Sequence, residues 1–200
     1  MTRPRRYGDA GQAFPIYITV VGGLLFLALA YFAVGQAAVN RNGAQTAADA
    51  AALAAAQDTR DKLAGEWVQD VLDPTQWQAI FGGQGVAFGG CNRADQLAAQ
   101  NDADVLTCAG NPSLLRYDVN VQTRKTMGES IVPVTASKKS KAFAAAVIEP
   151  LCTFKLPGAD AGDDVLPQLT CKDGRNWDLD PADLTDLPGP EDLFDVHLAD

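Results

Sequence analysis

The sequence is poor in the residues that build metal, redox and nucleic-acid sites. Its 200 residues include one histidine and four cysteines, and the cysteines lack the C-x-x-C spacing of zinc modules and thioredoxin-like centres. The net charge is −9, and the largest basic cluster beyond the N-terminus is Lys138, Lys139 and Lys141. Because neutralising phosphates requires clustered cations, the composition argues against a nucleic-acid partner.

Enzyme motifs are also missing. The sequence has no G-x-S-x-G, no phosphate-binding glycine loop ending in Lys-Ser/Thr and no H-E-x-x-H. The glycines of residues 82–85 precede neither a clear helix nor a phosphate-binding lysine. We therefore expect a protein without enzymatic activity, with no catalytic residue, cofactor, bound metal or small-molecule substrate.

Charge is absent from residues 10–40, although 20% of the whole chain is charged. Within this stretch, the apolar residues 14–34 would form a helix ~31 Å long, close to the ~30 Å hydrocarbon core of a bilayer. We predict a transmembrane helix over residues 14–38, with a proline in its first turn and tyrosines near both membrane surfaces. The residues that mark this span are Phe14, Pro15, Tyr17, Gly22, Gly23, Tyr31 and Val34.

Three arginines precede the predicted span: Arg3, Arg5 and Arg6. Because positively charged flanks stay in the cytoplasm, we predict that residues 1–13 are cytoplasmic and that the rest of the chain emerges outside the cell membrane. Only Asp9 offsets these arginines, whereas 13 bases and 24 acids follow the span. The charge is therefore polarised along the chain, and the lipid bilayer is its first predicted partner.

Two other interpretations of the apolar run remain open. Ala28-Leu29-Ala30 resembles a signal-peptidase site, so that cleavage after Ala30 would release the chain, but the apolar core of a signal peptide is only ~7 to 15 residues long. The other interpretation is a buried core helix of a soluble domain, which the length of the charge-free run disfavours.

An alanine-rich segment follows the span, and we predict that the helix continues through residues 39–72. Residues 44–56 contain nine alanines, the best helix former, and Asp73-Pro74 supplies a stop. Leu63, Trp67 and Val71 recur with helical spacing, which predicts that this end docks on a folded domain. The small alanine face either allows close approach between parallel helices in an assembly or merely fills a solvated helix.

This arrangement resembles the N-terminal region of the bacterial TadE/TadG-like family, which is associated with Flp-type (tight adherence) pilus assembly. The resemblance covers residues 8–60 and combines a Gly-Gln pair, one span and an alanine run. The residues that carry it are Gly11, Gln12, Ala47, Ala48, Asp49, Ala50, Ala51, Ala52 and Leu53. It implies other membrane proteins of a pilus or secretion apparatus as partners.

One position departs from the pilin-like pattern of that family. Cleaved members have a glutamate five residues after the glycine, which neutralises the new N-terminal amine, whereas Ile16 follows Gly11 at that place here. An uncompensated amine in the bilayer would be costly. The sequence therefore resembles the uncleaved, TadG-like side of the family, and processing after Gly11 is disfavoured.

Beyond the helix we predict an α+β fold, in which a long N-terminal transmembrane-plus-stalk helix is followed by a small antiparallel β-rich extracellular domain over residues 73–200. The stretch from residue 75 is rich in glycine and predicts loops, followed by a short helix over residues 93–100. Alternating or β-branched residues then predict five strands, over residues 116–123, 140–148, 152–156, 169–171 and 193–198. The alanine-rich 140–148 segment is also compatible with a helix.

All four cysteines fall in the predicted extracellular domain, which favours disulfides because that compartment is oxidising. Pairing of neighbours, Cys91 with Cys108 and Cys152 with Cys171, is the simplest of three connectivities. Free buried thiols are the alternative. A catalytic cysteine is disfavoured because the only histidine, His197, lies in a predicted terminal strand.

The C-terminal residues 178–200 contain eight carboxylates and no lysine or arginine. Asp173, Asn176, Asp178 and Asp180 loosely suggest oxygen ligands for calcium, but their spacing differs from that of an EF-hand loop. A solvated acidic loop is the simpler interpretation.

These observations support a single-pass, membrane-anchored accessory protein of a Flp/Tad-like pilus assembly or secretion apparatus. The alternative is a membrane-tethered extracellular binding or adhesion module that acts alone through its acidic C-terminus. A secreted enzyme released after Ala30 has little support, because no catalytic motif is present.

Overall fold

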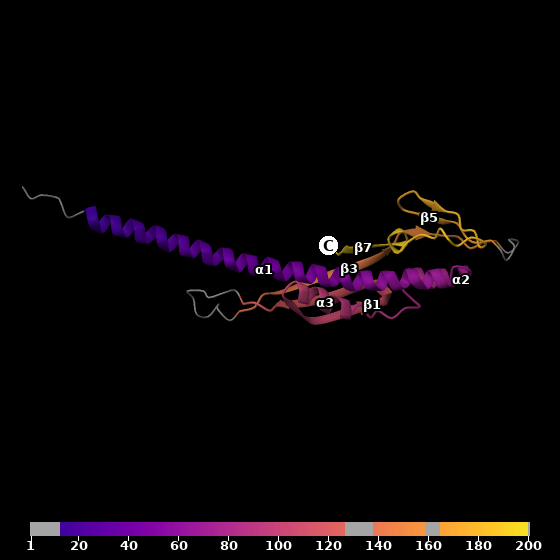
Figure 1. The fold of residues 1–200 in the computed structure, drawn as a ribbon, viewed down its shortest axis with the longest axis horizontal. Helices are drawn as coiled ribbons and strands as arrows, with labels where there is room; N and C mark the ends of the chain where they lie inside the picture. The colour runs from indigo at the N-terminus through magenta and orange to yellow at the C-terminus, as the bar shows by residue number, and fades with distance from the viewer. Residues whose placement is uncertain (1–12, 127–137, 159–164, 200) are drawn as a thin grey trace, which may run out of the picture.

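The longest element of the protein is α1 (Ala13–Gln69), a single helix of 57 residues that is ~86 Å long. The computed structural model describes residues 13–126, 138–158 and 165–199. The helix is unbroken at Gly43 and Gly65, so the alanine-rich sequence around them outweighs the ~1 kcal/mol that each glycine costs relative to alanine. Figure 1 shows that the N-terminal part of α1 projects beyond the strands.

A second helix, α2 (Pro74–Phe81), follows α1 after a short turn. The Asp73 carboxylate caps it by accepting a hydrogen bond from the Thr75 amide at 3.2 Å, and the Thr75 hydroxyl also donates to it. These bonds, chiefly that of the hydroxyl, lower the pKa of Asp73. The prediction of loops from residue 75 was therefore wrong at its start, because the Asp-Pro pair that ends one helix also begins the next.

The main sheet has four antiparallel strands in the order β1-β2-β3-β7. The predicted α+β fold is confirmed, and so are the strands near residues 116, 140 and 193. The strand β1 was not predicted, because its residues do not alternate regularly between buried and exposed positions. These elements and their neighbours are α3 (Cys91–Gln100), β1 (Ala103–Asn111), the 3-10 turn η1 (Pro112–Leu114), β2 (Arg116–Thr123), β3 (Lys141–Pro150) and β7 (Phe194–Leu198).

A small second sheet lies toward the α2 end of the molecule (Figure 1). Its three antiparallel strands are β4 (Cys152–Thr153), β5 (Leu169–Cys171) and β6 (Asn176–Trp177). The strand predicted over residues 152–156 is thus shorter than expected. A short helix, α4 (Pro190–Leu193), leads into β7, so Leu193 belongs to the helix rather than to the strand.

The core lies between the main sheet and the helices α1 and α3. Every second residue of β2 is buried, including Tyr117, Val119 and Val121, as their alternation predicts. At the far end, Leu63 and Trp67 of α1 are buried, and so is Val71 in the turn that follows, so the predicted docking is confirmed, although α1 ends at Gln69 rather than at residue 72 as predicted. An aromatic cluster closes that end, with ring centroids 5.2 to 5.9 Å apart between neighbours: Trp67, Trp77, Phe81, Phe154 and Phe194.

Candidate functional site at the apolar end of the long helix

The N-terminal part of α1 presents apolar side chains to solvent around its whole circumference. Phe14, Phe26 and Tyr31 are 71%, 71% and 83% exposed. Among the described residues, α1 is the one helix long and apolar enough to cross a membrane, and its apolar segment is not buried against the rest of the chain. A helix that is apolar on every side requires an apolar environment.

The residues predicted to mark the span lie within this exposed segment. Pro15 is in the first turn, and its carbonyl oxygen accepts a hydrogen bond from the Thr19 hydroxyl at 2.5 Å. A Cβ atom at Gly22 or Gly23 would meet nothing within 4 Å, so the packing of this chain on itself does not require these glycines. Tyr17, Tyr31 and Val34 are likewise exposed.

The alanine face has a different role from either of those expected. Ala47, Ala48, Ala51, Ala52 and Ala55 are fully buried against the main sheet and α3 of the same chain. The face is therefore neither solvated nor free to pack against a parallel helix, because the chain's own domain covers it. The other motif residues in this run, Asp49, Ala50 and Leu53, are half-buried at its edges.

The small side chains allow α3 to approach α1 closely. A Cβ atom on Gly90, the residue before α3, would lie 2.2 Å from the Ala55 carbonyl oxygen. The Tyr117 hydroxyl accepts a hydrogen bond from the Gly90 amide at 3.0 Å and is also bonded to the Thr59 hydroxyl. This junction was not predicted; the Gly89-Gly90 pair before a helix was its signal in the sequence.

Asn40, just beyond the predicted span, holds the end of β2 against α1. Its side-chain amide donates to the Thr126 carbonyl oxygen at 3.1 Å and to that of Lys125 at 3.4 Å. Its side-chain oxygen accepts from the Thr123 hydroxyl at 3.3 Å. These bonds fix the end of the main sheet beside the position on α1 at which the charge-free stretch ends.

The structure contains two disulfides in the neighbour pairing. Cys91 with Cys108 joins the start of α3 to β1, and Cys152 lies directly opposite Cys171 across β4 and β5. No cysteine is free, so the free-thiol alternative is wrong. Each bridge therefore fixes a peripheral element to its neighbour.

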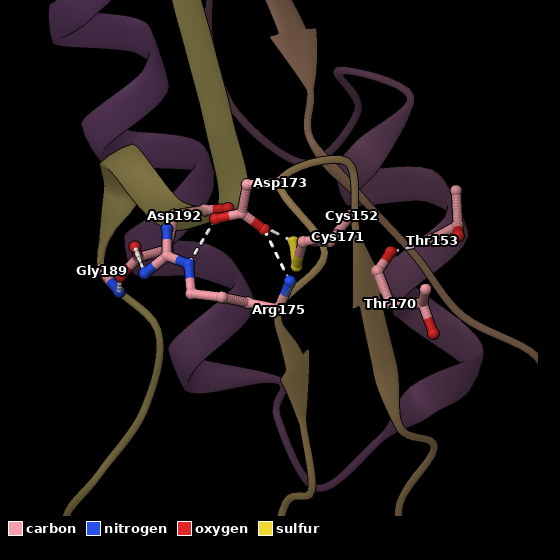
Figure 2. The surroundings of a disulfide bond; sticks show 8 residues. All are labelled: Cys152, Thr153, Thr170, Cys171, Asp173, Arg175, Gly189 and Asp192. Carbon is pink, nitrogen blue, oxygen red and sulfur yellow. Dashed lines mark hydrogen bonds and ion pairs between the residues drawn. A yellow bond between two sulfur atoms is a disulfide. The ribbon is translucent and has the colours of Figure 1, made fainter.

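Arg175 lies beside the disulfide between Cys152 and Cys171 and connects the loop that follows Cys171 to α4 (Figure 2). Its guanidinium forms ion pairs with Asp173 and with Asp192, the latter at 2.6 Å, while its amide donates to Asp173 at 2.9 Å. These hydrogen bonds lower the pKa of Asp173 and raise the pKa of Arg175. Since Asp192 belongs to α4 and also accepts from the Gly189 amide, the brace connects the small sheet to the start of β7.

Asn176, Asp178 and Asp180 line one groove, but each of the possible carboxylate ligands of calcium already has a hydrogen-bond partner. Asp173 binds Arg175, Asp178 accepts from Gln168, and Asp180 accepts from the Ala182 amide. Within the described part of the chain, the group of three possible ligand atoms found within 4.8 Å is Glu149, Asp195 and His197, all on the surface. In this group, Lys172 forms an ion pair with Glu149 and lowers the pKa of Glu149, and the Asp195 carboxylate accepts a hydrogen bond from His197 Nδ1 at 2.9 Å.

Some predicted residues lie outside the described part of the chain. These are the topology residues Arg3, Arg5 and Arg6 and the Gly-Gln pair, Gly11 and Gln12. The other predicted site residues are distributed along the molecule rather than gathered in one cavity. The span residues lie on the free end of α1, the alanine run lies in the core, and the disulfides lie in the domain.

Fold and surface together define a long helix with a free apolar end and a small α+β domain packed around its other end. Residues 11–58 match the family model described as "Putative Flp pilus-assembly TadE/G-like". The match runs from the start of the apolar segment through the buried alanine face, less than half of the chain, and confirms the resemblance over these residues. No curated protein and no solved structure matches the chain.

Proposed function

We propose that this protein is a single-pass, membrane-anchored accessory component of a Flp/Tad-like pilus assembly or secretion apparatus, and that it acts by binding rather than by catalysis. The observation that carries the proposal is the division of α1. Its apolar segment is exposed, whereas its alanine face is buried against the domain of the same chain. Membrane contact is thus the role left for the apolar segment, and the family match covers both parts.

In the proposed arrangement, residues 1–13 are cytoplasmic, residues 14–38 cross the membrane, and the helix from residue 39 carries the domain of residues 73–200 outside. The three N-terminal arginines favour this orientation. Two disulfides and no free cysteine also suit an oxidising compartment. The partners in the membrane are other proteins of the apparatus, which contact the exposed segment of α1.

The test combines topology with partner capture in intact cells. We expect the full-length protein to resist carbonate extraction and its domain to be digested by protease added outside spheroplasts. Photo-crosslinkers placed at exposed span positions such as Phe26 should capture pilin or the membrane proteins associated with a secretion ATPase; the matched control position is the buried Ala51. Capture of none of these proteins, together with normal pili in a deletion strain, would refute the proposal.

A second candidate function, a stand-alone adhesion module, has one supporting observation. A groove of about 510 Å³ is lined by Trp177, by Arg175, whose charge is paired with Asp173 and Asp192, and by four carboxylates: Asp178, Asp180, Asp183 and Asp186. Such a groove suits a cationic partner. Intact pili with altered surface binding after deletion of the gene would favour this function over the first.

A further inference from the structure

A hollow lies beside α1 where the predicted membrane span ends and the start of β3 approaches the helix. It has a volume of about 840 Å³. Its apolar side comes from the last turns of the predicted span, and its basic side comes from the helix and the strand. The residues that matter are Val34, Ala37 and Ala38 on the apolar side and Arg41, Lys139 and Lys141 on the basic side. We call this place the membrane-proximal hollow.

The three cations of the hollow are exposed, and none forms an ion pair with a carboxylate of the described residues. Arg41 is also the first charged residue after the charge-free stretch. By contrast, seven basic residues elsewhere in the described chain are paired, as Lys62 is with Asp58 and Lys172 with Glu149, and the unpaired Arg93 and Lys155 do not line the hollow. In a domain with an excess of acid, three cations left together indicate an anionic ligand.

Ser140 gives a second, independent indication. It lines the hollow and is 6% exposed, and its hydroxyl oxygen is shielded from solvent and has no hydrogen-bond partner among the described residues. Its backbone is fixed, because the Ser140 amide donates to the Thr123 hydroxyl at 3.1 Å and the Thr123 amide donates to the Ser140 carbonyl at 2.9 Å. Buried polar groups normally have partners, so this shielded hydroxyl is a donor that a ligand in the hollow would engage once the side chain turns toward it.

We propose that the membrane-proximal hollow binds the headgroup of an anionic phospholipid of the membrane that α1 crosses, an inference that rests on the proposed membrane anchoring. The phosphate lies among Arg41, Lys139 and Lys141 and accepts a hydrogen bond from the Ser140 hydroxyl after that side chain turns toward the hollow. The acyl chains run along Val34, Ala37 and Ala38 toward the bilayer. Two features favour a lipid over a soluble anion as the ligand. The cations would bind the phosphate, and the apolar side of the hollow continues into the predicted span, where acyl chains lie.

The experiment uses the full chain in phosphatidylcholine nanodiscs that contain phosphatidylglycerol, with retained lipid counted by native mass spectrometry after release. We expect the wild type to retain phosphatidylglycerol in preference to phosphatidylcholine. Neutralising the three cations together, as Arg41→Gln, Lys139→Gln and Lys141→Gln, should weaken this affinity by about 100-fold, since each basic residue near an anionic surface contributes about a factor of five.

The matched control neutralises three exposed cations far from the hollow, as Lys62→Gln, Arg93→Gln and Lys155→Gln, and should leave the affinity unchanged. Ser140→Ala should weaken it by about tenfold, the loss of one hydrogen bond to a charged group. The same variant should leave the melting temperature in pure phosphatidylcholine unchanged or raised, because it removes a buried hydroxyl that has no partner there. A merely structural serine would lower that temperature instead.

Three results would overturn the inference. One is equal phosphatidylglycerol affinity in the wild type and the triple variant. Another is displacement of the lipid by millimolar inorganic phosphate, which would indicate a site for a soluble anion. The third is a wild type that proves dimeric in the nanodiscs and a triple variant that is monomeric with the same lipid retention, which would assign the hollow to a second copy of the chain. Failure of the proposed function is distinguishable, because the chain would then be extracted by carbonate before any lipid is measured.

Discussion

The hydroxyl groups of Thr59 and Tyr117 lie 2.7 Å apart in the core and join α1 to β2. Both residues are fully buried, and the Tyr117 hydroxyl also accepts from the Gly90 amide. One phenol thus connects the long helix, the main sheet and the start of α3. Such a shared partner makes the three elements depend on one another, because the loss of one hydroxyl leaves two polar groups unpaired.

Tyr117→Phe should destabilise the domain by about 1 to 3 kcal/mol, because it leaves the Thr59 hydroxyl and the Gly90 amide buried without partners. The measurement is heat denaturation of the full chain in detergent, followed by near-ultraviolet circular dichroism. Tyr31→Phe removes the same hydroxyl from an exposed position and should leave the melting temperature unchanged. Equal melting temperatures for the two variants would show that the buried network contributes nothing.

Gly90→Ala should destabilise the domain by at least about 1 to 3 kcal/mol, the usual cost of overpacking a core. The backbone of Gly90 is in the ordinary helical region, so the cost is steric: the added carbon meets the Ala55 carbonyl. Gly89→Ala is the matched control, since its added carbon would have its nearest neighbour at 4.0 Å. Comparable expression and melting of both variants would contradict the close approach of α3 to α1.

Replacing either cysteine pair by serine should lower stability by about 3 kcal/mol in the chain-entropy model. The two losses should add when the pairs are replaced together, because the bridges constrain different elements. Melting of the oxidised full chain, of both double variants and of the quadruple variant measures this. Non-reducing peptide mapping provides the control for connectivity: it should yield one linked pair from Cys91 and Cys108 and another from Cys152 and Cys171.

Stability should fall when the pH drops below about 4, the ordinary value for a carboxyl group. Lys125, Lys172 and Arg175 lower the pKa values of their partners Asp102, Glu149 and Asp173 through hydrogen bonds. A carboxyl group whose pKa is lowered in the folded state stabilises the fold at pH values above its pKa in the unfolded chain. This contribution disappears as the pH falls through the lowered pKa of the folded state.

The measurement is the melting temperature of the full chain between pH 2.5 and 7. Because these groups are exposed, the effect of each is small, and 0.5 M salt should reduce it further. Glu149→Gln should flatten the acid limb of the profile relative to the wild type. A wild-type profile that does not change in this range would contradict the prediction.

Residue patterns predicted those parts of the fold in which the buried side chains recur with the regular period of a helix or a strand. Leu63, Trp67 and Val71 showed the buried side of α1, and the alternation from Tyr117 onward showed β2, because period and burial coincide there. The strand β1 was missed because its side chains face several environments. The start of α2 was missed because a helix stop and a helix start share the same two residues.

The candidate sites were harder to predict because they depend on pairs of residues far apart in the chain. The alanine run predicted a face that permits close packing, but composition does not specify the packing partner, which proves to be the chain's own sheet and α3. In the sequence, Lys139 belongs to a basic cluster with Lys138 and Lys141, about 100 residues away from Arg41. Their meeting in one hollow depends on the register of β3 against α1, which the sequence pattern leaves open.

Because α1 is continuous, a tilt at its apolar end displaces its other end. From Val34 to Trp67 the helix runs ~50 Å without a break, and its far end is locked into the aromatic cluster. In the proposed arrangement no joint separates the membrane from the domain, so a change of only 10° in the tilt of the span would carry the distal end sideways by ~9 Å. Movements of neighbouring helices within the bilayer would then be magnified, rather than absorbed, on their way to the surface of the domain.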